Sequence, residues 1–211
     1  MPDDARGAGT RRRLVEATMT TIRTHGIAKV SARTIATTGG LNQALVFYHF
    51  GSVDALVAEA CLVSTAERVA SFEERLDDVN GLADLVRLAQ DLHAQEKQLG
   101  NVTILGQVLA GSQTNPALAE VTGKALSLWT ERIQQVLTVV LADSPLGEAL
   151  DPALLAELVS AAFIGIELVE PTRPDEGGSV AALDRLVPLA QALDDLGPLA
   201  RRAVRSALRP R

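Results

Sequence analysis

The sequence contains very little cysteine: Cys61 is the only one in 211 residues. A single cysteine excludes an intrachain disulfide, and a reducing compartment is the simplest setting for such a protein. The amino terminus, MPDDARGAGTRRR, lacks the apolar segment of a secretory signal. The most apolar run, Leu158 to Ile166, is shorter than a bilayer requires. These absences predict a cytoplasmic protein with no membrane partner, in which Cys61 is a buried thiol within an apolar helical pattern.

Sequence signatures of catalysis and of metal binding are also missing. The chain has no HExxH and no GxSxG motif. Lys124 follows Gly123, but Leu118 stands where a phosphate-binding loop needs its first glycine. Three isolated histidines and one cysteine do not have the spacing of metal ligands. We therefore expect a protein that is not an enzyme and that holds no cofactor and no metal ion.

Aromatic residues are scarce as well, and half of them fall in one place. The chain has four Phe, one Tyr and one Trp, yet Phe47, Tyr48 and Phe50 lie within four consecutive positions, with His49 among them. Four successive side chains of a helix point in different directions, so they cannot all be buried. Part of this helical turn must meet something outside the core.

Charge is distributed unevenly along the chain. The formal net charge is −6, but residues 1–50 hold seven basic residues against three acidic ones, a net +4, which leaves −10 for the rest. The basic residues are Arg6, Arg11, Arg12, Arg13, Arg23, Lys29 and Arg33. A basic head on an acidic body is consistent with binding of a polyanion, although a solvated charged face gives the same pattern.

What the sequence does contain is helical periodicity. Apolar residues recur at three- and four-residue spacing almost throughout, and alternation with period two never persists, which predicts an all-α protein. Residues 1–9 are expected to be frayed, with Thr10 capping the first helix. Breakers separate helices expected at 10–25, 31–38, 42–50, 53–76, 81–98, 101–111, 116–142 and 152–169. A last helical region follows Ser179, where Pro188 is expected to introduce a kink and Gly197-Pro198 an interruption.

The helices at 31–38 and 42–50 form a helix-turn-helix pattern. Ser31 and Asn42 are suited to cap them, and Ala36 is small where they should cross. Gly40 can adopt the left-handed conformation that the turn needs, and a Cβ at this position is expected to push the pair apart. Ile35 and Val46 are expected to fill the space between this pair and the first helix.

In this motif the second helix lies in the DNA major groove, with its N-terminal half at the base edges. The helical spacing places Leu41, Val46 and Phe50 on the inner face. The residues left to face DNA are Gln43, Ala44, Phe47, Tyr48 and His49. Gln43 suits adenine, Arg33 suits guanine, and Ala44 or Leu45 can touch a thymine methyl group.

Several positions between residues 11 and 60 follow one known pattern: Gly26-Ile27, Ser31, Ile35-Ala36, Gly40-Leu41, His49-Phe50, and Ser52 with Leu56. On these positions the segment resembles the DNA-binding domain of the TetR/AcrR family of transcriptional regulators. The resemblance implies an N-terminal three-helix DNA-binding domain (1–52) and a larger helical ligand-binding and dimerisation domain (53–211). It implies a ligand-responsive regulator, a repressor that binds a palindromic operator in double-stranded DNA as a homodimer.

Two departures from the family pattern leave alternatives open. The family commonly has Tyr at the position of Phe47 and Lys at the position of Val53, and uses them to bind phosphates. Phosphate contacts can shift to other groups, or operator affinity can be weaker, or the chain can be a protein-interaction or adaptor dimer that has lost operator binding. The predicted DNA-binding residues are Arg11, Arg12, Ser31, Arg33, Thr34, Asn42, Gln43, Ala44, Phe47, Tyr48 and His49. For His49 the alternative is a half-buried residue that bridges helices, and for the arginine run it is a solvated helix start.

The body of the chain gives weaker signals. The helix at 152–169 is apolar around much of its circumference, so it needs neighbours on several sides. The family resemblance assigns it to a dimer interface, with Leu155, Leu158, Val159, Ala162, Phe163 and Ile166; the alternative is a helix central to its own domain. Isolated polar or amphipathic residues in the middle helices, His93, Gln107 and Trp129, are candidates for contact with a small, mostly apolar effector, and each can equally be a satisfied interior residue.

Overall fold

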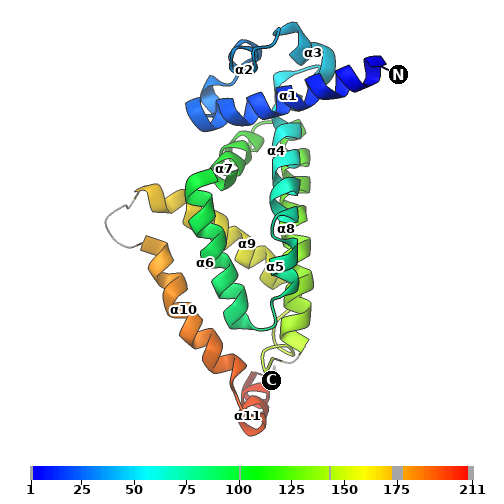
Figure 1. Cartoon of the computed structure of the whole chain (residues 1–211). Helices are drawn as coiled ribbons and strands as arrows, with labels where there is room; N and C mark the ends of the chain where they lie inside the picture. The colour runs from blue at the N-terminus through cyan, green and yellow to red at the C-terminus, as the bar shows by residue number, and fades with distance from the viewer. Residues whose placement is uncertain (1, 100, 143, 173–177, 209–211) are drawn as a thin grey trace. The chain divides into compact units, whose positions relative to one another are not determined.

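The computed structural model describes residues 2–99, 101–142, 144–172 and 178–208 (Figure 1). Every regular element in these ranges is a helix, which confirms the all-α prediction. The α-helices are α1 (Pro2–His25), α2 (Ala32–Gly39), α3 (Ala44–Phe50), α4 (Val53–Ala70), α5 (Glu73–Asp77), α6 (Leu82–Leu99), α7 (Asn101–Ser112), α8 (Pro116–Ala142), α9 (Pro152–Val169), α10 (Gly178–Asp194) and α11 (Pro198–Leu208). Two 3-10 turns, η1 (Ile27–Lys29) and η2 (Glu170–Thr172), join their neighbours.

Two expected helix boundaries were wrong. Helix α1 begins at Pro2, so Thr10 lies inside it and is not its N-cap; proline at a first helical position has its φ already set for a helix. The helix expected at 53–76 is divided at Phe72, whose backbone leaves the helical region at φ −109° and whose side chain is 2% exposed. Helix α10 continues through Pro188, where the expected kink stays a prediction, and the expected interruption at Gly197-Pro198 separates α10 from α11.

The chain packs as two compact units. The N-terminal unit comprises Met1–Arg68 and Gly100–Leu126, and the C-terminal unit comprises Val69–Leu99 and Ser127–Arg211. The packing boundaries therefore fall inside α4 and α8, as well as between α6 and α7. The predicted boundary between a DNA-binding domain (1–52) and a ligand-binding and dimerisation domain (53–211) differs from these packing boundaries, and it stays a prediction.

The core of the N-terminal unit joins α1, α2, α3 and α4. Its most deeply buried apolar side chains are Leu14, Ile22, Ile35, Val46 and Leu56, each at most 1% exposed. Ile35 and Val46 are therefore buried in the core of this unit, as expected for residues of the inner face. Thr18 and Thr21 are also fully buried on α1, and their hydroxyls donate to the carbonyls of Leu14 and Ala17 one turn earlier. These bonds satisfy the buried hydroxyls within α1, and the Thr21 hydroxyl also lies 3.0 Å from the hydroxyl of Thr38 on α2.

In the C-terminal unit, α5, α6, α8 and α9 contribute to two apolar clusters. One contains Phe72, Leu76, Val79, Leu88, Val136 and Val140; the other contains Leu137, Leu141 and Ala156. Helix α10 runs beside α6 (Figure 1). The carboxylate of Asp194, at the end of α10, accepts from the backbone N–H groups of Leu82 (3.1 Å) and Ala83 (2.9 Å). A carboxylate at this position satisfies two unpaired donors at the start of α6 and complements its dipole.

Helix α9 is the most apolar long helix of the described residues. Its 18 residues have a mean hydropathy of 1.8, and 17% of them are buried. By length and composition α9 can cross a membrane, and so can α3 and α4 taken together as one span bent by 68°. The apolar segment is thus longer than the run from Leu158 to Ile166. Large exposed apolar side chains lie on α9 and on α10, and we call this set the α9–α10 apolar face: Leu154, Leu158, Leu168, Val169, Leu186 and Leu189.

Candidate nucleic-acid interface

The first helix of the predicted motif begins and ends as the sequence indicates. The Ser31 hydroxyl accepts from the Thr34 backbone N–H (3.1 Å), and the Thr34 hydroxyl accepts from the Ser31 N–H (2.9 Å). This reciprocal capping box fixes the start of α2. At its other end Gly40 has φ +60° and ψ +41°, the left-handed conformation predicted for the turn.

The close contact in this turn belongs to Gly39 and not to Gly40. A Cβ added at Gly40 would have no atom within 4 Å, so the expectation that it pushes the helices apart was wrong, and its cost is one of backbone conformation. A Cβ at Gly39 would lie 2.9 Å from the Cβ of Ala17 on α1. Gly39 therefore allows α2 to approach α1 closely.

The second helix presents its aromatic residues outward. The Asn42 side-chain oxygen accepts from the Ala44 N–H (2.9 Å), so the helix itself begins at Ala44, two residues later than expected. Val46 is fully buried, while Phe47 is 54% and Tyr48 83% exposed. His49 is half-buried, and its ring meets that of Tyr48 edge to face with centroids 4.9 Å apart. Burying Val46 thus turns two aromatic rings to the surface, where apolar side chains need a partner.

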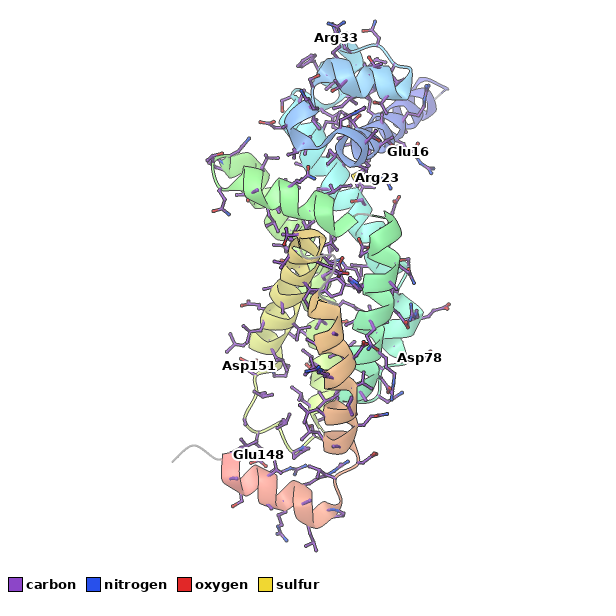
Figure 2. All side chains as sticks on the ribbon, turned by 90° about the vertical axis from the view of Figure 1, so that its left-hand side faces the viewer. Glu16, Arg23, Arg33, Asp78, Glu148 and Asp151 are labelled. Atoms are coloured by element: carbon purple, nitrogen blue, oxygen red, sulfur yellow. The ribbon has the colours of Figure 1, made fainter. Side chains whose placement is uncertain are left out.

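The predicted DNA-binding residues share one region of the N-terminal unit but differ in availability. The exposed ones are Arg11, Arg12, Ser31, Arg33, Asn42, Gln43, Ala44, Phe47 and Tyr48, whereas Thr34 and His49 are half-buried. Figure 2 shows Arg33 at the outer side of α2, with Arg23 on the opposite side of the same three-helix group. Ser31 and Thr34 already use their hydroxyls for capping, so a phosphate contact there would be an additional hydrogen bond.

The arginine run at 11–13 is engaged within the protein. Arg11 pairs with Glu59 of α4 (2.6 Å), and its guanidinium lies 4.8 Å from the centre of the Phe50 ring. Arg13 donates to the Gly39 carbonyl at the end of α2 (3.1 Å), a favourable place for a cation. Arg12 pairs with Glu16 one turn on (2.9 Å), across an exposed surface where such pairs are weak. Arg12 is therefore the most available of the three for a phosphate.

The three candidate effector residues each have a partner inside the protein. His93 is 3% exposed; its Nδ1 lies 2.6 Å from the Glu167 carboxylate and its Nε2 lies 3.0 Å from that of Glu170. Trp129 packs against the cluster that contains Phe72, and the centroids of the Trp129 and Phe72 rings are 6.4 Å apart. Gln107 belongs to the N-terminal unit, and its side-chain oxygen accepts from the Ile27 backbone N–H (2.7 Å). Their role in effector binding stays a prediction.

Burial governs the titration of two groups in these units. Loss of hydration raises the pKa of Glu167, and the hydrogen bond and charge of His93 only partly oppose this. Burial likewise raises the pKa of the Cys61 thiol to about 11, opposed by a hydrogen bond with Thr65. The predicted buried thiol is confirmed, and a thiol that resists ionisation is a poor nucleophile.

The predicted dimer residues are divided between two sides of α9. Leu158, 67% exposed, and Ala162 lie on the exposed side. Leu155 packs against the cluster of Leu137 and Leu141, so it belongs to the interior of its own unit. Val159, Phe163 and Ile166 are half-buried. Leu154, Leu168 and Val169 are also exposed on α9 but were not among the predicted residues, although the four-residue spacing of Leu154 and Leu158 places both on one face of the helix.

Comparison with known proteins finds one family model that matches the N-terminal segment and several solved structures with a similar fold. Residues 14–60 match the sequence model of the bacterial regulatory proteins of the tetR family. No curated protein sequence matches the chain. Among solved structures, a transcriptional regulator from Rhodococcus sp. Rha1 is similar at 21% identity, over 89% of this chain and 99% of that one, with a TM-score of 0.66.

Two further solved structures are similar over most of the chain. Salmonella enterica GusR has 21% identity, covers 95% of each chain and has a TM-score of 0.63. The transcriptional regulator FadR of Bacillus subtilis, in complex with stearoyl-CoA, has 14% identity, covers 88% of this chain and 99% of that one, and has a TM-score of 0.69. The likeness extends from the matched N-terminal segment over the helices that follow, so the fold is that of the TetR-family regulators.

Proposed function

We propose that this chain is a ligand-responsive repressor that binds a palindromic operator as a homodimer in the cytoplasm. It is a DNA-binding regulator, not an enzyme, and its N-terminal segment matches the tetR-family model. One observation carries the DNA-binding part: α3 buries Val46 completely and exposes Phe47 and Tyr48 beside Gln43 and Ala44. In a helix-turn-helix this is the face that enters the major groove. The net charge of +4 on residues 1–50 favours approach to a polyanion.

The α9–α10 apolar face supports the homodimer. It presents large exposed side chains on two neighbouring helices, and an apolar surface of this kind is stable in water only when it is covered. A second copy related by a two-fold axis would cover it with the same face and form a four-helix bundle. A membrane would cover it too, but α9 also carries Glu167, which is buried and paired with His93 of α6. That contact makes α9 a helix of the protein's own bundle.

Effector binding is the least constrained part of the proposal. FadR is described in complex with stearoyl-CoA, and another similar structure is the multidrug binding protein EbrR, with 21% identity and a TM-score of 0.61. Here we propose a small, mostly apolar effector for the C-terminal helices, whose buried leucine- and valine-rich cluster packs against Trp129. Effector and operator must weaken each other's binding by the same factor. Trp129, the only tryptophan, provides a fluorescence signal for screening such molecules.

The direct test is retention of a duplex from the gene's own upstream region in a gel-shift at moderate salt. Operator binding gives a shift that a scrambled duplex of equal length does not compete away. The alternative, an adaptor dimer that has lost operator binding, gives no shift beyond that of the scrambled duplex. Phe47 and Val53 replace two phosphate-binding residues of the family pattern, so the salt dependence of the shift measures how far Arg12, Tyr48 and other groups compensate.

We expect Arg33→Ala to weaken binding of the retained duplex by about 1–3 kcal/mol and to relax the preference at one base position. The guanidinium projects from the outer side of α2, where it can reach a guanine. Arg23→Ala is the matched control, because it removes the same charge from an exposed position on the other side of the group. Base preference is measured by binding selection from a randomised duplex pool. An unchanged preferred sequence in Arg33→Ala would mean that α2 and α3 are oriented differently on DNA.

A further inference from the structure

Gln107 is the long polar side chain in the buried stretch of α7. Its neighbours Ile104, Leu105 and Val108 are at most 6% exposed. An amide in such surroundings is costly unless it is hydrogen-bonded. Its oxygen accepts from the backbone N–H of Ile27, at 2.7 Å.

The Ile27 N–H needs this partner because of how the chain leaves α1. Gly26 ends α1 with its own N–H bonded to the Ile22 carbonyl, and then turns at φ +75° and ψ +162°. Ile27 is the first residue of η1, and the first N–H groups of a helical turn have no acceptor within the turn. The side chain of Gln107 supplies it from a position 80 residues away in the sequence.

A second contact of the same kind lies at the other end of the helix-turn-helix. The Asn115 side-chain nitrogen donates to the carboxylate of Asp54, at 2.7 Å, in the first turn of α4. The oxygen of the same Asn115 side chain accepts from the Leu118 N–H (3.4 Å) at the start of α8. Ile27 stands just before α2 and Asp54 just after α3. The two contacts therefore flank α2 and α3 in the chain, and both come from the segment containing α7 and the start of α8, which belongs to the same compact unit.

We propose that Gln107 and Asn115 are positioning residues that hold the helix-turn-helix at both of its ends, so that α7 and the start of α8 are part of the DNA-binding body. The inference rests on the proposed DNA binding. The two contacts add to the direct chain connection that α4 provides after the motif. A helix-turn-helix that is already held in place loses little conformational freedom when it binds DNA. Its affinity for DNA is therefore higher than that of a mobile one.

The test replaces Gln107 by Met, which has a similar shape and no acceptor oxygen comparable to the amide. We expect hydrogen exchange of the Ile27 amide to become at least about tenfold faster, and the affinity for the upstream duplex to fall roughly fivefold, the equivalent of one net hydrogen bond at about 1 kcal/mol. Gln107→Glu keeps an accepting oxygen and should restore both values. Gln113→Met makes the same replacement at an exposed position of the following loop and should change neither.

Asn115→Asp tests the other contact with its cap intact. Aspartate still accepts from Leu118 N–H, but it cannot donate to Asp54 and repels it, so the duplex affinity should fall in the same direction while the helical content is unchanged. It also serves if Gln107→Met does not fold. Faster exchange at Ile27 with an unchanged affinity would overturn the proposal and leave a merely structural bond. A wild-type protein that retains no duplex would overturn the DNA-binding function, and the proposal with it.

Discussion

Leu158→Glu is expected to convert the protein into a soluble monomer and to lower its affinity for a palindromic operator on the order of 100-fold or more, because two linked half-site contacts become one. Leu158 belongs to the α9–α10 apolar face and is 67% exposed, so the monomer fold tolerates glutamate there. In the dimer the carboxylate would be desolvated against apolar side chains, which is costly without a partner. Sedimentation velocity reports the oligomeric state, and the gel-shift reports the affinity.

Val139→Glu is the matched control for this substitution. Val139 is 66% exposed, but it lies on α8 and outside the α9–α10 apolar face. The Val139→Glu substitution should leave both the oligomeric state and the affinity for the duplex unchanged. A Leu158→Glu protein that sediments as the wild-type dimer would place the interface elsewhere. A wild-type monomer with undiminished operator binding would contradict the homodimer itself.

The features predicted correctly from sequence are those that depend on neighbouring residues. Ser31 and Thr34 form their capping box within one turn, and Gly40 takes the left-handed conformation directly after α2. The helix expected at 152–169 does begin at Pro152, where the structure adds an Asp151 side chain that accepts from the Ala153 N–H. Hydrophobic periodicity likewise placed Val46 inside and Phe47 and Tyr48 outside, because a helix fixes the direction of each side chain relative to the next.

The features that sequence could not predict depend on residues far apart in the chain. The sequence predicts Arg11 as a contact for DNA phosphates, but its ion pair with Glu59, 48 residues away, is seen only in the structure. Gln107 reads as a pocket residue, whereas its partner is a backbone N–H 80 residues earlier. Phe72 interrupts a helix with good periodicity because the core buries its ring. No local pattern contains this information, since tertiary packing decides each case.

The second large effect concerns the buried pair of His93 and Glu167 in the C-terminal unit. We expect His93→Leu to lower the free energy of unfolding by about 3 kcal/mol, because removing one partner of a buried pair leaves the other carboxylate desolvated. Urea unfolding followed by the fluorescence of Trp129, which packs in the same unit, measures this. His25→Leu makes the same replacement at an exposed position at the end of α1, where the change should stay within about 0.5 kcal/mol. The double variant His93→Leu, Glu167→Met should regain much of the lost free energy of unfolding, since no unpaired charge is then left at that pair. Equal losses in the single and double variants would mean that the two residues are not energetically coupled.

The same pair predicts how stability depends on pH. Desolvation raises the pKa of Glu167 in the folded protein above its usual 4.5, despite the opposing effect of His93, and the charges of Glu96 and Glu170 act in the same upward direction. The folded state therefore binds this proton more tightly than the unfolded chain does. The resulting contribution to stability is complete below pH 4.5 and is lost as the pH rises through the folded pKa. The Glu167→Gln variant tests this dependence, because its amide can still accept a hydrogen bond from His93 and has no carboxyl proton to lose. The stability of Glu167→Gln relative to wild type is therefore expected to increase between pH 4.5 and neutral pH. Urea unfolding of both proteins across this range tests the sign, and a relative stability that falls with rising pH would show that the ion pair with His93 outweighs the desolvation of Glu167.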